Sequence, residues 1–70
     1  MRMVPVSSSN LSAVGYNTDT RTLRIEFNSG GLYDYSGVPS HIHQGLMSAS
    51  SHGQYFHQHI RDNYPYNRLR

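Results

Sequence analysis

The fold is decided by residues 22–35, which read TLRIEFNSGGLYDY. In the first six of these residues, Leu23, Ile25 and Phe27 alternate with polar side chains, which is the period-two pattern of a strand with one buried face. The turn-forming string NSGG follows, and then a second short run that contains two tyrosines. The stretch therefore predicts a β-hairpin.

The length of the hairpin loop decides which side chains of the second strand face the core. A two-residue loop would pair Ile25 with Asp34 and would place a carboxylate on the apolar face, which costs free energy. A three-residue loop, with Gly30 left-handed in a bulge, instead sets Asp34 opposite Arg24 on the outer face, where the opposite charges attract. We therefore predict the three-residue loop.

This register also places both tyrosines of the second strand on the apolar face. Tyr33 lies opposite Ile25, and Tyr35 lies opposite Leu23. A chain that is short of aliphatic residues needs aromatic rings as core material, which favours burial of both tyrosines. The alternative is that the two rings form a platform on which a ligand stacks.

The remaining segments predict a sheet followed by helices. Short strands are expected at residues 3–6 and 11–16, and amphipathic spacing predicts helices over residues 39–49 and 53–62. Gly45, inside the first helix, is expected to allow close packing on the sheet. The fold class that follows is α+β: an antiparallel meander of three to four strands followed by two helices packed on one sheet face.

Length and composition limit the domain organisation. The chain has 70 residues, a net charge of +2, six arginines without any lysine, and no cysteine. This length allows one domain with a small core, and the lack of cysteine excludes disulfides and thiolate zinc sites. We expect one domain over residues 1–70, with its core at about residues 6–64 and a C-terminal tail at residues 65–70.

The sequence also bears on the compartment. No segment approaches the roughly 18 consecutive apolar residues that a membrane-spanning helix needs. The first six residues lack the apolar stretch of about 7–15 residues that is typical of a secretory signal. We therefore expect a cytoplasmic protein without a membrane partner.

The spacing of polar residues gives no support to catalytic or metal chemistry. Two histidine pairs, His41 with His43 and His57 with His59, have a spacing of two, so the members of each pair point to nearly opposite sides of a helix and cannot share a metal. No nucleophile elbow and no phosphate-binding glycine loop occurs. We expect no enzyme activity, no catalytic residue, no metal and no cofactor.

Arginine and tyrosine residues are the remaining functional signal. Bases of single-stranded nucleic acids stack on tyrosine rings with about 1–3 kcal/mol each, and guanidinium groups pair with phosphates. The pattern suggests weak binding of a single-stranded nucleic acid, in which Arg61 and Arg68 contact phosphate while Tyr55, Tyr33 and Tyr35 stack with bases or line the site. The alternative for the arginines is a solvated C-terminal end.

A protein-interaction module is the alternative function. The second face of the sheet and the segment 64–66 would expose aromatic area to a larger partner protein. Binding of that kind would be insensitive to salt, whereas phosphate contacts weaken steeply as salt rises. The sequence leaves open the identity of the partner and the oligomeric state.

Short motifs occur in a fixed order from about residue 6 to residue 68. They are Ser8-Ser9-Asn10-Leu11, Gly15-Tyr16, Leu23-x-Ile25-x-Phe27, Gly30, Tyr33-x-Tyr35, Val38-Pro39, Leu46, Ala49-x-Ser51-x-Gly53-x-Tyr55-Phe56, Ile60-Arg61 and Tyr64. This series resembles the KTSC domain, a family named after a C-terminal domain of some lysyl-tRNA synthetases that also occurs free-standing in bacteria and their phages.

The resemblance implies a small α+β domain with the Y-x-Y motif near its centre, but no established activity. Attachment to a tRNA-charging enzyme suggests a tRNA-like RNA as partner, which is an association and not a mechanism. One position departs from the pattern, because His57 follows Phe56 where the family is expected to show asparagine. If this position contacts a ligand, His57 makes the contact pH-dependent.

Overall fold

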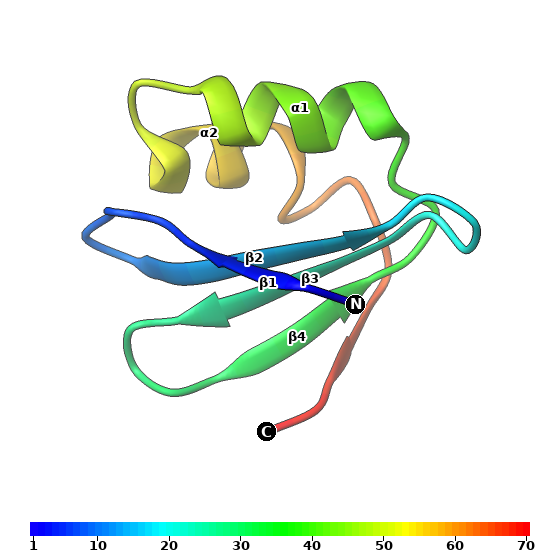
Figure 1. The fold of residues 1–70 in the computed structure, drawn as a ribbon, viewed down its shortest axis with the longest axis horizontal. Helices are drawn as coiled ribbons and strands as arrows, with labels where there is room; N and C mark the ends of the chain where they lie inside the picture. The colour runs from blue at the N-terminus through cyan, green and yellow to red at the C-terminus, as the bar shows by residue number, and fades with distance from the viewer.

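Residues 1–70, all described by a computed structural model, form a five-stranded antiparallel sheet with two helices on one face (Figure 1). The elements in chain order are β1 (Met3–Pro5), β2 (Leu11–Asn17), β3 (Thr22–Phe27), β4 (Leu32–Tyr35), α1 (Ser40–Ser48), α2 (His52–His59) and β5 (Tyr66–Arg68). The strands follow one another across the sheet in sequence order. The predicted α+β class is confirmed, as are the antiparallel meander and the two helices on one face. Neither helix has the length and apolar character needed to span a membrane.

The predicted tail at residues 65–70 is wrong, because this segment carries a fifth strand. β5 pairs antiparallel with β4, so that Tyr66 lies opposite Tyr35 and Arg68 lies opposite Tyr33. All three residues of β5 are exposed, and they therefore show none of the alternation that reveals a half-buried strand in a sequence. The strand is held through its backbone and not through a buried face.

The β3–β4 hairpin has the predicted register. The three expected cross-strand pairs are present, namely Leu23–Tyr35, Ile25–Tyr33 and Arg24–Asp34. Gly30 closes the three-residue loop with a φ of 99°, a left-handed value that glycine adopts without steric cost. On the outer face, the Arg24 guanidinium donates to both carboxylate oxygens of Asp34, at 2.7 and 2.9 Å.

The hydrophobic core fills the space between the inner face of the sheet and the two helices. Its nine residues are Leu11, Val14, Leu23, Ile25, Tyr35, Val38, Leu46, Phe56 and Ile60. Phe27, which the alternation assigns to the core, is only partly buried and packs at its margin, as does Tyr33. The core therefore ends where the hairpin loop begins, and aromatic rings mark that boundary.

Gly45 has a different role from the one that the sequence suggests. A Cβ atom at Gly45 would lie 2.6 Å from Cζ of Tyr55, so this glycine makes room for the Tyr55 ring of α2 and not for the sheet. The close approach of ring and backbone fixes α1 against α2.

The start of α2 is placed by a cap and by a contact with the β1–β2 loop. The Ser51 hydroxyl accepts a hydrogen bond from the Gln54 N–H at 3.2 Å, which satisfies one of the free donors of the first turn. A Cβ atom at Gly53 would lie 3.1 Å from Nδ2 of Asn10. The motif that contains Asn10 and the motif that contains Gly53 thus meet here. Their contact directs Phe56 and His57 toward the hairpin loop.

Candidate functional site: an aromatic cleft with two free arginines

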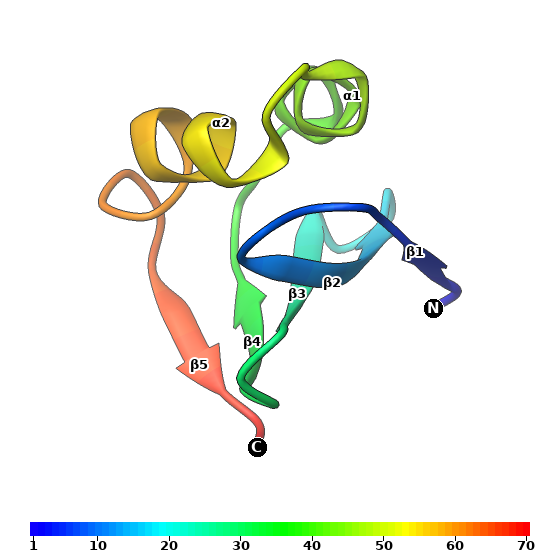
Figure 2. The ribbon, with the colours of Figure 1, turned by 90° about the vertical axis from the view of Figure 1, so that its left-hand side faces the viewer.

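A cleft of about 700 Å³ lies where α2 faces the hairpin loop and β5. Figure 2 views the molecule from the end at which these elements meet. Four segments that are separate in the sequence contribute to the lining, which consists of Ser9, Asn10, Phe27, Asn28, Ser29, Gly31, Tyr33, Tyr35, Phe56, His57, Arg61, Asp62, Tyr66 and Arg68. We call this feature the aromatic cleft.

Four of the five site residues suggested by the sequence lie together in the aromatic cleft. Tyr33 and Tyr35 come from β4, Arg61 follows α2, and Arg68 ends β5. Tyr55 lies apart from them: its ring packs against Gly45 and contacts the His59 ring in a tilted arrangement, with 4.4 Å between ring centroids.

Five aromatic rings form a continuous cluster in the cleft. Phe27 contacts Tyr33 and Phe56 with centroid distances of 5.5 and 5.3 Å. Tyr35 contacts Phe56 at 5.5 Å and Tyr66 at 5.7 Å, and Tyr66 contacts Tyr33 at 5.5 Å. Exposure rises across the cluster, from 4% for Tyr35 to 61% for Tyr66. The cluster therefore has a rigid floor and a ring that is open to solvent.

Tyr35 provides an uncharged hydroxyl at the floor of the cleft. Burial raises the pKa of Tyr35 to about 12; Tyr33 and Tyr66 add to this shift, and Arg61 opposes it. The hydroxyl makes none of the side-chain hydrogen bonds of the protein, and no buried polar side-chain atom lacks a partner. The hydroxyl therefore reaches the solvent of the cleft, where it is a neutral donor and acceptor at physiological pH.

Two guanidinium groups flank the aromatic cluster without forming an ion pair. The two ion pairs of the protein, Arg24–Asp34 and Arg70–Glu26, lie outside the cleft lining. Arg61 Nη1 lies 3.2 Å from His57 Nδ1, and the Arg68 guanidinium carbon lies 5.5 Å from the centroid of the Tyr33 ring. Asp62 is the single carboxylate in the lining. The cleft thus combines excess positive charge with open aromatic surface.

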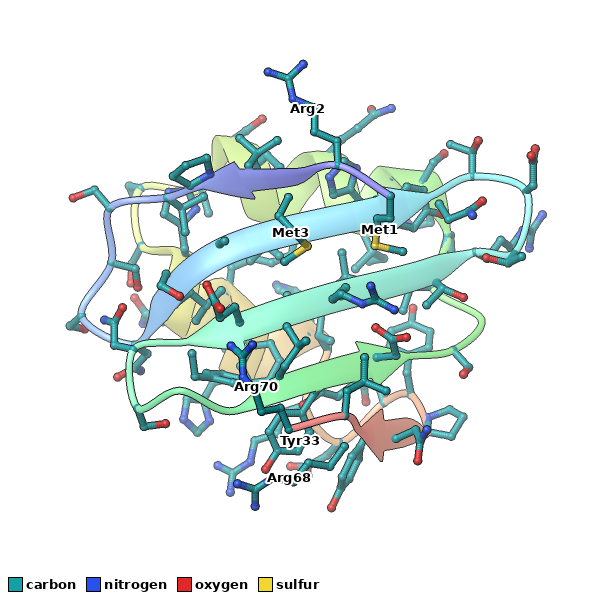
Figure 3. The ribbon with its side chains drawn as sticks, turned by 60° about the horizontal axis from the view of Figure 1, so that its bottom comes forward. Met1, Arg2, Met3, Tyr33, Arg68 and Arg70 are labelled. Atoms are coloured by element: carbon teal, nitrogen blue, oxygen red, sulfur yellow. The ribbon has the colours of Figure 1, made fainter.

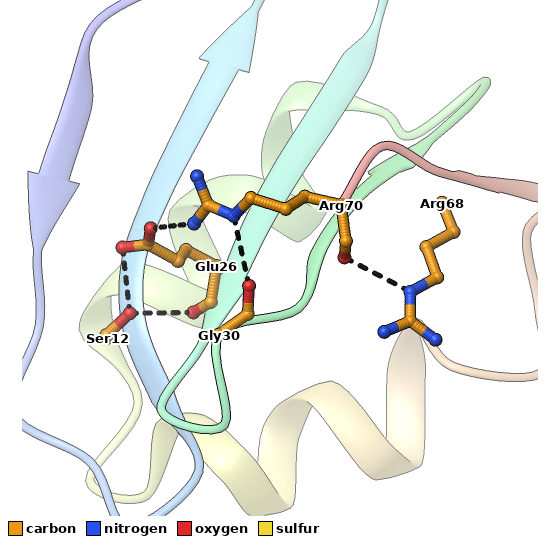
Figure 4. Close-up of polar contacts among 5 residues, drawn as sticks. All are labelled: Ser12, Glu26, Gly30, Arg68 and Arg70. Atoms are coloured by element: carbon orange, nitrogen blue, oxygen red, sulfur yellow. Dashed lines mark hydrogen bonds and ion pairs between the residues drawn. The ribbon is translucent and has the colours of Figure 1, made fainter.

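Arg70 fastens the end of β5 across the hairpin loop (Figure 4). Its Nη2 lies 2.6 Å from Oε2 of Glu26, and its Nε donates to the Gly30 carbonyl at 3.1 Å. Glu26 also accepts from the Ser12 hydroxyl at 2.9 Å. The Arg70 contact, with a smaller contribution from Ser12, lowers the pKa of Glu26. Because the Arg70 carbonyl accepts from Nε of Arg68 at 3.1 Å, this contact also positions a cleft arginine.

The outer face of the sheet lacks the aromatic area that a protein-interaction module would expose there. Figure 3 shows this face, with Met1 and Met3 on it and with Tyr33 at the β5 edge. A Cβ atom at Gly15 would lie 2.8 and 2.6 Å from the sulfurs of Met1 and Met3, so the thioethers fill a notch over β2. Tyr66 is the only tyrosine or phenylalanine that is exposed, and it lies in the cleft.

Several cleft residues had no role in the sequence-based site. Phe27 and Phe56 carry the periodicity of core positions, and Tyr66 lies in a strand that has no sequence signature. Asn10 and Asn28 look like ordinary turn residues, although the motif Ser8-Ser9-Asn10-Leu11 marks the first of them. No group of three or more histidine or acidic side chains is placed to hold a metal ion.

Comparisons with known proteins agree with the fold and its motifs. Residues 7–64 match the model of the KTSC domain family. An uncharacterised protein of Stutzerimonas stutzeri (strain A1501) is 41% identical over 58 residues, which are 83% of this chain and 82% of that protein. A lysine–tRNA ligase of Nostoc sp. (strain PCC 7120) is 41% identical over 61 residues, which are 87% of this chain but 11% of the ligase.

A solved structure supports the same relationship. The crystal structure of a KTSC domain protein from Yersinia pestis superposes with a TM-score of 0.96 and 39% sequence identity. The superposition covers 99% of this chain and 97% of the other, so it includes the edge strands that lie beyond the family match. The chain belongs to the KTSC domain family.

Proposed function

We propose that the protein is a non-enzymatic module that binds single-stranded RNA weakly in the aromatic cleft. The observation that carries this proposal is the meeting of the exposed Tyr66 ring and the partly exposed Tyr33 ring with two guanidinium groups that form no ion pair, brought together from β4, β5 and the segment after α2. Stacking platforms beside cations are the common design of single-strand binding sites. Relatives named lysine–tRNA ligase carry a similar segment, and the substrate in that name is an RNA.

The size and chemistry of the cleft suit one or two nucleotides. Its volume of about 700 Å³ lies within the usual range of ligand pockets, about 300–1,000 Å³. The Tyr66 and Tyr33 rings are the accessible stacking surfaces, and Arg61 and Arg68 are placed to meet phosphates on either side. Two stacked bases contribute about 2–6 kcal/mol, and a dissociation constant of about 1 mM corresponds to 4 kcal/mol. We expect affinities in the millimolar to micromolar range.

Binding without catalysis is also part of the proposal. The only histidine in the lining, His57, has its Nδ1 within hydrogen-bond distance of Arg61 and not of a hydroxyl. A hydroxyl nucleophile that is activated by a neighbouring base must lie within hydrogen-bond distance of that base. The residues of the cleft are therefore better suited to holding an RNA segment than to cleaving it.

The test is the affinity of a fluorescently labelled single-stranded RNA octamer for Arg61→Gln and Arg68→Gln variants. Each substitution should weaken binding roughly two- to fivefold, because an exposed ion pair contributes about 0.5–1 kcal/mol. Each should also reduce the slope of log affinity against log salt by about 0.7, the value for one phosphate contact on a single strand.

Arg2→Gln is the matched control, because Arg2 is exposed and makes the same charge change outside the cleft. Its affinity and salt slope should equal those of the wild type. An equal loss in all three variants would mean diffuse charge attraction and not a site. Absence of RNA binding at any salt concentration would favour a protein partner.

A further inference from the structure

His57 lies in the last turn of α2, Arg61 lies two residues beyond the end of that helix, and both side chains line the cleft. Nη1 of Arg61 lies 3.2 Å from Nδ1 of His57. A guanidinium group is always protonated in proteins and can only donate, so Nδ1 of His57 must accept this hydrogen bond. An imidazole that accepts at Nδ1 is uncharged and carries its proton on Nε2. The contact in the free cleft therefore belongs to the neutral form of His57.

An anion in the cleft favours the protonated form of His57 instead of the neutral form. Protonated His57 can no longer accept from Arg61, and in the free protein two positive charges would then lie side by side, because the two side chains are 3.2 Å apart. An anion placed between the two side chains removes this repulsion and accepts a hydrogen bond from each of them. Anion binding and protonation of His57 therefore favour one another, and the coupling is reciprocal by linkage.

We propose that His57 and Arg61 form a phosphate subsite of the aromatic cleft, in which a backbone phosphodiester binds together with a proton on His57. This inference rests on the proposed function, since the phosphate is that of the bound RNA. It also gives a chemical meaning to the replacement of the asparagine that the family resemblance leads us to expect after Phe56: an amide side chain could contact the same phosphate, but it could not take up a proton.

Six other titratable or charged groups line the cleft around His57, and Asp62 is the only carboxylate among them. The titratable and charged side chains that line the cleft with it are Arg61, Asp62, Tyr33, Tyr35, Tyr66 and Arg68. Arg61 and Arg68 are the two cations among these groups. The hairpin loop and the β1–β2 loop contribute only asparagine, serine and glycine. A phosphate would therefore be the main negative charge that His57 meets.

The experiment follows the ring signals of all five histidines by NMR, between about pH 5.5 and about pH 8, with and without dimethyl phosphate. This diester mimic stays a monoanion throughout that range, so it does not itself titrate. Addition of the mimic should raise the titration midpoint of His57 by about half a pH unit or more, as an opposite charge does at short range. His59, whose ring contacts Tyr55 outside the cleft, should not shift and is the internal control.

The second arm measures affinity for single-stranded RNA with hydroxyl ends over the same pH range. Linkage converts half a pH unit into an affinity about threefold higher at about pH 5.5 than at about pH 8. His57→Asn should lose the increase in affinity at low pH, so that its affinity no longer changes between about pH 5.5 and about pH 8. His41→Asn is the matched control at an exposed position of α1 and should keep the wild-type profile.

The two arms separate this inference from the proposed function. RNA binding that does not depend on pH, with an unmoved His57 midpoint, would overturn the subsite and leave RNA binding intact. A His57 midpoint that moves with dimethyl phosphate, in a protein that does not bind RNA, would support the phosphate subsite and contradict the RNA proposal. A wild-type pH profile in His57→Asn would assign the proton to another group and overturn the inference.

Discussion

The sequence leaves two roles open for Tyr33 and Tyr35, which lie two residues apart on β4: core residue or binding surface. In the structure, each of the two tyrosines has one of these roles. Tyr35 is 4% exposed and belongs to the core, whereas Tyr33 is partly exposed beneath Arg68. The alternation of β3 predicts the shared face of the two rings. It cannot predict where along that face the core ends, because this depends on how far α2 extends over the hairpin. The same limit explains why Phe27 is a cleft residue and not a fully buried one.

The raised pKa of Tyr35 predicts a late phenol titration and a loss of stability at high pH. A phenol with a pKa of about 12 in the folded protein and about 10 in the unfolded chain supports folding fully below pH 10. That support declines as the pH rises toward 12. Near-ultraviolet absorbance should show one late tyrosine that is missing in Tyr35→Phe, and this variant should resist alkaline unfolding better. Simultaneous titration of all tyrosines near pH 10 would disprove the assignment.

Tyr66 and Tyr55 offer a matched pair of substitutions for the stacking surface. Tyr66→Leu removes the most exposed ring of the cleft and should cost about 1–3 kcal/mol of RNA-binding free energy. Tyr55→Leu removes a ring on the other side of α2 and should leave the affinity at the wild-type value. Fluorescence anisotropy with the same RNA measures both variants. The site is misplaced if Tyr55→Leu is the more damaging change.

At the scale of elements, the strands that bury one face could be predicted and the edge strand could not. The register of β3 and β4 follows from keeping Asp34 off the apolar face, and the structure agrees. β5 consists of three exposed residues, and what holds it is backbone pairing together with Arg70. Arg70 and Glu26 lie far apart in the chain, so no local pattern in the sequence predicts their contact. The cleft could not be predicted from the sequence without β5, because this strand supplies Tyr66 and Arg68.

The tether of β5 should respond to acid through Glu26. Hydrogen bonds from Arg70 and Ser12 lower the pKa of Glu26, so the carboxylate supports the docked strand above its unfolded pKa of about 4.3. This support is lost as the pH falls through the lower folded value. Amide chemical shifts of residues 66–70 should move toward unstructured values on acidification. Arg70→Gln should show such shifts already at neutral pH, and unchanged shifts in that variant would contradict the role of the tether.

At the scale of the whole molecule, a small core supports a comparatively large aromatic cleft. Of the 70 residues, 13 are buried, and α2 contributes to both regions through one short segment: Phe56 lies in the core and in the cleft lining, and His57 follows it directly. Substitutions in α2 therefore need a stability measurement before they are interpreted as binding effects. The positive charge of the cleft is also a property of the whole molecule, because both cleft arginines that form no ion pair lie at the end where β5 meets α2.

The core assignment predicts a graded loss of stability. Ile60→Ala removes a side chain that is 0% exposed and should cost about 2–5 kcal/mol, which is enough to unfold a marginally stable small domain. Phe27→Ala should also destabilise, but by less than a fully buried phenylalanine would, because water can reach the space that the ring leaves. Urea unfolding followed by circular dichroism measures both losses. Wild-type stability of Ile60→Ala would refute the packing described above.

The most direct measurement is an amide-resolved NMR titration of the wild-type protein with short single-stranded RNA, at low and at near-physiological salt. If the aromatic cleft is the binding site, the shifts should cluster on Asn28, Tyr33, His57, Arg61 and Arg68, and they should weaken as salt rises. Shifts centred on Tyr55 and the outer side of the helices, or on the outer face of the sheet, would contradict the account. So would the absence of any shift at low salt.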